Sequence, residues 1–115
     1  MNVNIQNKVQ ITLKLEKEPD VHYFQSGGSV VTCTCRHPFI NNEGEEKTAF
    51  FIEAKFWFRE NEDPDISDKL AVGEVFEVVG ELRRESWKDK NTDAWKEKWV
   101  INNCELLVSD REPAF

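Results

Sequence analysis

The stretch Thr48–Arg59 reads TAFFIEAKFWFR and decides the fold of this chain. Its side chains alternate with period two, the pattern of a β-strand that turns one face toward a core. The first face is uniformly apolar and consists of Phe50, Ile52, Ala54, Phe56 and Phe58. The second face mixes charges with two large rings and consists of Phe51, Glu53, Lys55, Trp57 and Arg59. The stretch therefore predicts a half-buried strand whose outer face carries rings and charges together.

Similar strand patterns lie on both sides of this stretch. The predicted strands are Val9–Leu15, Ser29–His37, Thr48–Arg59, Glu74–Trp87 and Trp95–Leu107. A short extension at Val21–Phe24 precedes a glycine turn at residues 25–28. Ile66–Ala71 favours one or two helical turns between the third and fourth strands, and Lys88–Ala94 favours the tip of a long hairpin between the fourth and fifth. This order predicts an all-β fold, a five-stranded Greek-key OB barrel, because closure protects the edge strands of a small β-domain.

The composition narrows the class of protein. A chain of 115 residues that is 39% hydrophobic predicts one globular domain. No apolar run approaches the roughly 20 residues of a spanning helix, and the N-terminal residues do not resemble a secretory signal, so we expect a cytoplasmic protein. The three cysteines, Cys33, Cys35 and Cys104, favour buried free thiols. A zinc site would recruit His37 as well, but its C-x-C spacing is unusual, and we expect no metal or other cofactor.

The charge distribution is uneven, and no catalytic motif accompanies it. The formal net charge is −7, whereas residues 83–98 carry six basic and four acidic side chains, a local net charge of +2. A local basic strip can follow a phosphate backbone even on an acidic protein. The two histidines, His22 and His37, have no obvious nucleophile beside them, and no phosphate loop or metalloprotease motif is present. The sequence therefore predicts a binding protein and no enzyme.

Large rings at predicted surface positions indicate what is bound. They have the strand parity or loop position of surface residues and are Phe51, Trp57, Trp87, Trp95 and Trp99. Bases stack on such rings with about 1–3 kcal/mol each and little sequence preference. Basic residues are interleaved with the rings and could neutralise phosphates: Lys55, Arg59, Arg83, Lys88 and Lys90. The pattern favours a single-stranded nucleic acid. The alternative is an OB-fold protein-interaction module of a replication or restart complex, in which the rings form a protein interface.

Several motifs together resemble one family. Asn7–Val9 followed by Glu18–Tyr23 is similar to its opening N-K-V and D-P-E-V-R-Y, Ser26–Val30 to its S-G-G-A-V turn, and Gly80–Trp87 to its G-x-L-R-x-R-x-W strand. In order and spacing the chain resembles the bacterial single-stranded-DNA-binding proteins over roughly residues 7–108. The resemblance implies an OB-fold domain at residues 1–108 that binds single-stranded DNA in replication, repair or recombination.

The resemblance also assigns roles to residues. The family's pair of stacking rings on the third strand matches Phe51 and Trp57, and a further position matches Trp87. Phe39 is a possible substitute for a loop tryptophan, and Trp95 is a further candidate. The family implies a homotetramer or homodimer. Its acidic tip, which recruits replication and repair proteins, resembles the short tail at residues 109–115, which ends in Phe115; an ordinary chain end is the alternative.

Overall fold

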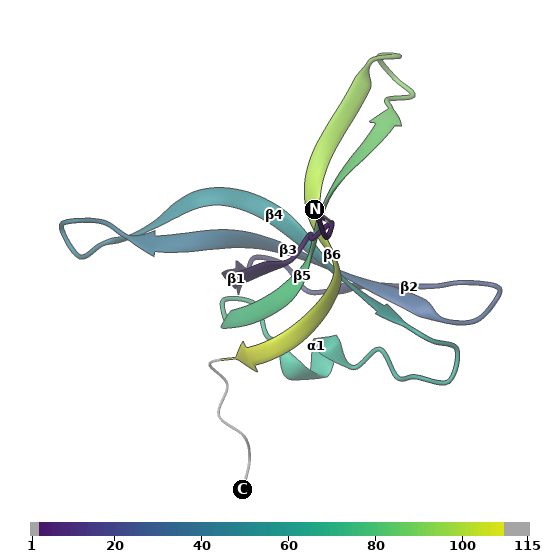
Figure 1. The fold of residues 1–115 in the computed structure, drawn as a ribbon, viewed down its shortest axis with the longest axis horizontal. Helices are drawn as coiled ribbons and strands as arrows, with labels where there is room; N and C mark the ends of the chain where they lie inside the picture. Colours follow the sequence, from purple (N-terminus) through teal and green to yellow (C-terminus); the bar gives the residue numbers. More distant parts are fainter. Residues whose placement is uncertain (1–2, 110–115) are drawn as a thin grey trace, which may run out of the picture.

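The computed structural model describes residues 3–109, which form six strands and one short helix (Figure 1). The strands are β1 (Val9–Leu15), β2 (Asp20–Tyr23), β3 (Ser29–Ile40), β4 (Glu46–Phe58), β5 (Val75–Lys88) and β6 (Trp95–Ser109). One turn of helix, α1 (Ile66–Lys69), lies between β4 and β5. Within the described residues, no helix is long and apolar enough to cross a membrane.

All six strands belong to one sheet, in the order β1-β5-β6-β4-β3-β2. The neighbours pair antiparallel except β4 and β6, which are parallel at Glu53–Val100 and Ala54–Ile101. β1 also pairs with β3, where Lys14 lies opposite Arg36 and Leu15 opposite Cys35. The strand pairings therefore form a closed circuit, β1-β5-β6-β4-β3-β1, with β2 outside it.

The number of strands differs from the sequence prediction of five. Residues Asp20–Tyr23 are a separate strand, β2, which pairs with the first residues of β3 from Tyr23–Ser29 to Asp20–Thr32. The turn between these strands contains Gly27 and Gly28, whose φ angles are 92° and 81°. Glycine adopts this left-handed conformation without strain, so the chain can reverse here and form the extra hairpin.

The core consists of the inward side chains of the circuit. Its fully buried members include Leu13, Leu15, Val31, Cys33, Cys35, Ala54, Phe76, Val78 and Ile101. Ile66 of α1 and Leu70 after it belong to the same cluster. Burial raises the pKa of Cys33 and of Cys104 to about 12, and it raises the pKa of Cys35 as well. The thiols therefore stay protonated at neutral pH and pack as small apolar groups.

β6 breaks the alternation that its sequence predicts. Strict period two would place Val100 and Asn102 on one face with Cys104 and Leu106. In the structure Ile101 is in the core with the partly buried Cys104 and Leu106, because the pairing of β5 with β6 shifts between Val79 and Glu81. Asn103, with φ 52°, supplies the extra residue. Such a bulge exchanges the two faces of a strand beyond it.

Two long hairpins extend from the sheet, β3–β4 and β5–β6, and Figure 1 shows them pointing in different directions. They explain a radius of gyration of 16.2 Å, which exceeds the about 13 Å expected of a compact domain of this size. Phe50 belongs to the β3–β4 hairpin. It was predicted in the core, but it is 40% exposed, because this part of β4 has passed beyond the core.

Candidate nucleic-acid interface

Three adjacent strands, β4, β6 and β5, present one continuous outer face. The strand register aligns it: Glu53 lies beside Val100, Val100 beside Arg83, and Lys98 beside Glu85. We call this surface the outer face, and its residues are Phe51, Glu53, Lys55, Trp57, Arg83, Glu85, Trp87, Lys98, Val100 and Asn102. It brings together five of the predicted site residues, which are Phe51, Trp57, Trp87, Lys55 and Arg83.

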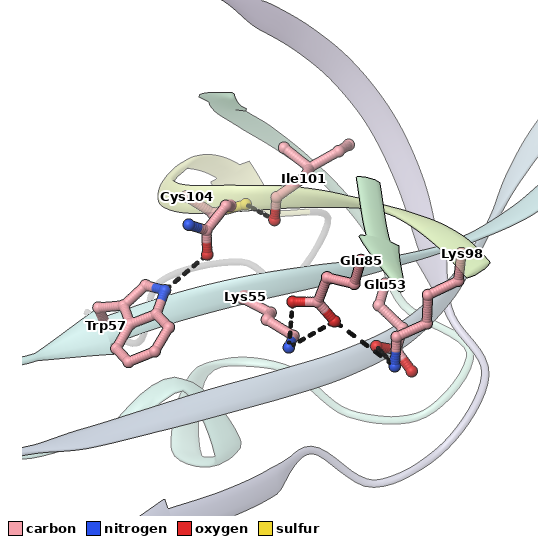
Figure 2. A network of polar contacts seen from close by, with 8 residues as sticks. Glu53, Lys55, Trp57, Glu85, Lys98, Ile101 and Cys104 are labelled. Carbon is pink, nitrogen blue, oxygen red and sulfur yellow. Dashed lines mark hydrogen bonds and ion pairs between the residues drawn. The ribbon is translucent and has the colours of Figure 1, made fainter. Parts of the chain in front are cut away.

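Trp57 is held in place from two sides. Its ring lies parallel to that of Phe24, with centroids 5.7 Å apart. Its Nε1 donates a hydrogen bond to Asn102 Oδ1 at 2.6 Å, which is the dashed line at Trp57 in Figure 2. Phe24 in turn meets His22 edge to face at 4.9 Å. Trp57 nevertheless remains 48% exposed. It is therefore a fixed ring with free surface, as a base-stacking position requires.

The sequence reasoning missed Phe24 and Asn102 as supports of Trp57. Phe24 follows β2 and lies just before the Gly27–Gly28 turn, which returns the chain to β3. Asn102 reaches Trp57 because the parallel pairing sets β6 beside β4. A large ring directly before a paired-glycine turn was a local signal for the first contact. No local signal exists for the second, which depends on the sheet order.

Four charged residues of the outer face form a chain of ion pairs, shown in Figure 2. Lys55 Nζ donates to both carboxylate oxygens of Glu85, at 3.1 and 2.8 Å. Lys98 Nζ lies 2.8 Å from Glu53 Oε1 and 3.8 Å from Glu85 Oε1. We call Lys55, Glu85, Lys98 and Glu53 the ion network. Two cations and two anions leave this part of the face without net charge.

Trp87 and Phe51 are the other two rings of the outer face. Lys98 Nζ lies 5.5 Å from the centroid of the Trp87 ring, within the range of a cation–π contact. Phe51 is 68% exposed and lies opposite Arg36 of β3. Both rings leave large apolar surface open to solvent, which a binding partner would cover.

The remaining basic site residues differ in whether they have an ion-pair partner. Arg83 pairs with Glu81 at 2.9 Å, and Lys88 pairs with Asp93 at 3.2 Å across the hairpin tip. Within residues 3–109, no ion pair involves the side chains of Arg59 or Lys90. Arg59 follows β4 and Lys90 lies in the β5–β6 turn, so these two unpaired cations flank the outer face.

Two predicted rings lie away from the outer face. Trp95 pairs with Lys88, one position beyond Trp87, so both of these residues point to the opposite side of the β5–β6 hairpin. Phe39 is exposed near the end of β3, opposite Lys47, far along the β3–β4 hairpin. The structure therefore does not gather Trp95 or Phe39 with Phe51, Trp57 and Trp87.

An apolar groove of about 420 Å³ opens beside the outer face. Its lining comes mainly from inward side chains that continue the core toward the two hairpins: Val9, Ile11, Phe50, Phe51, Ile52, Leu82, Trp99 and Ile101. Trp99, which is exposed, directly follows Lys98 in β6. Its side chain therefore lies on the same side of β6 as that of Trp95 and on the opposite side from Lys98. The groove is thus a second apolar surface, which shares only Phe51 with the outer face.

The tip of the β5–β6 hairpin is organised by Asp89. Its Oδ1 accepts hydrogen bonds from the backbone N–H of Asn91 at 2.8 Å and of Thr92 at 3.3 Å, and Lys96 Nζ lies 3.3 Å from Oδ2. These contacts, led by the Asn91 N–H, lower the pKa of Asp89. The tip that carries Lys90 is therefore ordered by a charged turn residue.

The chemistry of this surface suits binding. Fixed and exposed rings can stack on flat groups, and the cations at the edges can meet phosphates. Among residues 3–109, no group of three or more His, Cys, Asp or Glu side chains is placed to hold a metal ion. The buried thiols lie in the core and away from the outer face.

Comparisons with known proteins agree with this geometry. The model of the single-strand binding protein family matches residues 6–107. Single-stranded DNA-binding protein 2 of Nostoc sp. is 28% identical over 96% of this chain and 84% of its own length, and single-stranded DNA-binding protein 1 of Synechocystis sp. is 26% identical over 94% and 88%. The solved Plasmodium falciparum SSB complex with ssDNA superimposes with a TM-score of 0.65 at 23% identity, covering 94% of this chain and all of that one. Because the family model spans nearly the whole chain, this protein belongs to the single-strand binding protein family.

Proposed function

We propose that this protein binds single-stranded DNA, largely without sequence preference, by stacking bases on the outer face. The observation that carries the proposal is the position of Phe51, Trp57 and Trp87 on one side of three adjacent strands. The names of the two cyanobacterial relatives support the choice of ligand. Bound in this way, the protein would protect exposed strands in replication, repair or recombination without catalysing a reaction.

The proposal divides the predicted site residues into two groups. Phe51, Trp57 and Trp87 stack bases, because they are exposed rings on one face. The basic residues Lys55, Arg59, Arg83, Lys88 and Lys90 are the candidate phosphate contacts, and among them Arg59 and Lys90 can meet a phosphate without losing an ion pair within the described residues. Trp95 and Phe39 would contact the DNA strand only if the DNA continued around the β5–β6 and β3–β4 hairpins.

The fold part of the proposal is a five-stranded OB barrel. The closed circuit of β1, β5, β6, β4 and β3 supports it, since closure removes exposed strand edges. The barrel would be the binding domain at residues 1–108. The short acidic tail predicted at residues 109–115 lies, from residue 110 on, outside the described residues. Recruitment of replication or repair proteins through Phe115 and a cytoplasmic location remain proposals from the sequence.

Self-association into a homotetramer or homodimer also belongs to the proposal. The apolar groove supports it, because monomeric proteins seldom expose connected apolar surface. Size-exclusion chromatography with light scattering at micromolar concentration is expected to give a multiple of the chain mass. A monomer under these conditions would remove this part of the proposal.

The test of DNA binding is quenching of tryptophan fluorescence by oligo-dT, titrated at low and at high salt. Strong quenching is expected, because bases would stack on Trp57 and Trp87. Binding should weaken as salt rises, because phosphate contacts release counterions. Absence of quenching even at low salt would contradict the proposal.

The second candidate is an OB-fold protein-interaction module of a replication or restart complex. The ion network favours it, because Lys55 and Lys98 already have carboxylate partners and the chain is acidic overall. In that case the same rings would form a protein interface, as aromatic residues often do. The titration separates the two candidates, since a protein interface predicts no quenching by oligo-dT.

A further inference from the structure

The ion network occupies the middle of the surface on which DNA is proposed to lie. The side chains of Lys55 and Glu53 are only 18% and 25% exposed. Water and salt therefore screen the ion pairs of these two residues less than they would screen a fully exposed ion pair. Glu53 Oε1 is buried and accepts no hydrogen bond within residues 3–109, and its contact with Lys98 is an ion pair of 2.8 Å. Val100, between Glu53 and Arg83, is completely buried. The ion network is therefore partly buried, with Lys55 and Glu53 less exposed than Glu85 and Lys98.

A phosphate cannot reach Lys55 or Lys98 without competing with a carboxylate. Glu85 contacts both lysines, through two hydrogen bonds to Lys55 and an ion pair to Lys98, whereas Glu53 contacts Lys98 alone. A lysine that exchanges its carboxylate for a phosphate leaves the carboxylate behind, and that anion then attracts cations from solution. The exchange therefore releases few counterions overall, and the usual electrostatic gain of a lysine–phosphate contact is lost.

We propose that Glu53 and Glu85 are determinants of the binding mode: they occupy Lys55 and Lys98, so that bases and not phosphates lie on the outer face. This inference rests on the proposed binding of single-stranded DNA and specifies how the strand is oriented. The backbone would run along the edges of the face, where Arg59 and Lys90 are unpaired among the described residues. The affinity for DNA would therefore fall less steeply with salt than expected if Lys55 and Lys98 contacted phosphates.

The variants Glu85→Gln and Glu53→Gln test the inference, since each keeps the size of the side chain and removes its charge. The control is Glu97→Gln, which changes the net charge equally but lies opposite Ser86, on the other side of the β5–β6 hairpin, and pairs with Arg84 at 3.3 Å. Each protein is titrated with oligo-dT at several salt concentrations, and the slope of log affinity against log salt is compared. Circular dichroism verifies that each variant is folded.

Glu85→Gln should bind more tightly at low salt and steepen the slope by about 0.7 to 1.4, because about 0.7 is expected for each lysine that a single strand newly contacts. Glu53→Gln should steepen it by about 0.7, and Glu97→Gln by clearly less. Equal steepening by all three variants would overturn the inference, because net charge alone would then explain it. Weaker binding by Glu85→Gln would overturn it too, because the carboxylate would then be positioning the lysines.

The outcome for the unchanged protein separates this inference from the proposed function. Binding by the unchanged protein with no response to Glu85→Gln or Glu53→Gln overturns the inference and leaves the function in place. No binding by the unchanged protein together with binding by Glu85→Gln supports masking of the lysines while refuting the proposed function. No binding by any of the four proteins overturns both. If Glu85→Gln does not fold, Glu53→Gln and its control decide.

Discussion

The indole ring of Trp57 and the phenyl ring of Phe24 lie nearly parallel, with centroids 5.7 Å apart and planes inclined by 7°. Phe24 covers one side of the indole, and the hydrogen bond from Nε1 to Asn102 fixes its rotation. A base that stacks on Trp57 would therefore become the third layer of a stack already begun inside the protein. Such a ring loses little conformational freedom on binding, which favours affinity.

Removing Phe24 should weaken DNA binding even though we do not expect Phe24 to contact the strand. Phe24→Leu keeps an apolar side chain but removes an aromatic pair worth about 0.5–1.5 kcal/mol. If that energy serves to hold Trp57, the affinity for oligo-dT should fall by about 2- to 10-fold. Fluorescence titration measures the change. The control is Val108→Ala, an exposed residue near the far end of β6. Unchanged affinity in Phe24→Leu would show that Trp57 does not need this support.

The two tryptophans of the β5–β6 hairpin should differ in their contribution to binding. Trp87 lies on the outer face, whereas Trp95, opposite Lys88, lies on the other side of the hairpin. Trp87→Leu should lose the stacking energy of about 1–3 kcal/mol, which is about 5- to 150-fold in affinity. Trp95→Leu serves as its matched partner and should lose much less. Equal losses of affinity in titrations with oligo-dT would mean that the DNA strand wraps around the β5–β6 hairpin.

The strands could be predicted because their pattern is local. Thr48–Arg59 was predicted and β4 spans Glu46–Phe58; Trp95–Leu107 was predicted and β6 spans Trp95–Ser109. Period two appears within a few residues and needs no knowledge of the neighbours. The face on which each residue of β6 lies could not be read in the same way, since the bulge at Asn103 comes from pairing with β5.

The composition of the candidate site was only partly predictable. Parity placed Phe51, Lys55 and Trp57 together, because they are separated by even numbers of residues on one strand. The partner of Lys55 is Glu85, 30 residues away, and the two meet only because β4 and β5 both lie next to β6 in the sheet. Charge counting along the sequence therefore overstated how many cations are free to meet phosphate.

The hairpin tip should loosen in acid as Asp89 becomes protonated. Hydrogen bonds from the Asn91 N–H first, and then contacts with Lys96 and the Thr92 N–H, hold the pKa of Asp89 below its ordinary value of 3.8. Because the pKa is lower in the folded protein, its stabilising contribution is complete above about pH 4–5 and is lost as pH falls through the folded pKa. The Asn91 amide chemical shift should therefore titrate with a midpoint below 3.8. This titration should disappear in Asp89→Asn, and a midpoint at or above 3.8 would contradict the turn geometry.

Gly80 should be intolerant of any side chain, because β6 leaves no space for a Cβ atom at this position of β5. A Cβ atom here would lie 2.7 Å from the Asn102 carbonyl oxygen and 2.7 Å from Ile101 Cγ2. Its backbone is not left-handed, so with free space Gly80→Ala would stabilise the protein by about 0.4–1 kcal/mol through the unfolded chain. We expect the opposite sign, a loss of about 1–3 kcal/mol and a fall in Tm of about 4 °C or more. Gly80→Val should lose more than Gly80→Ala. A Tm that rises in Gly80→Ala would show that β5 and β6 are not in contact at the bulge, and the exchange of faces in β6 would then need another explanation.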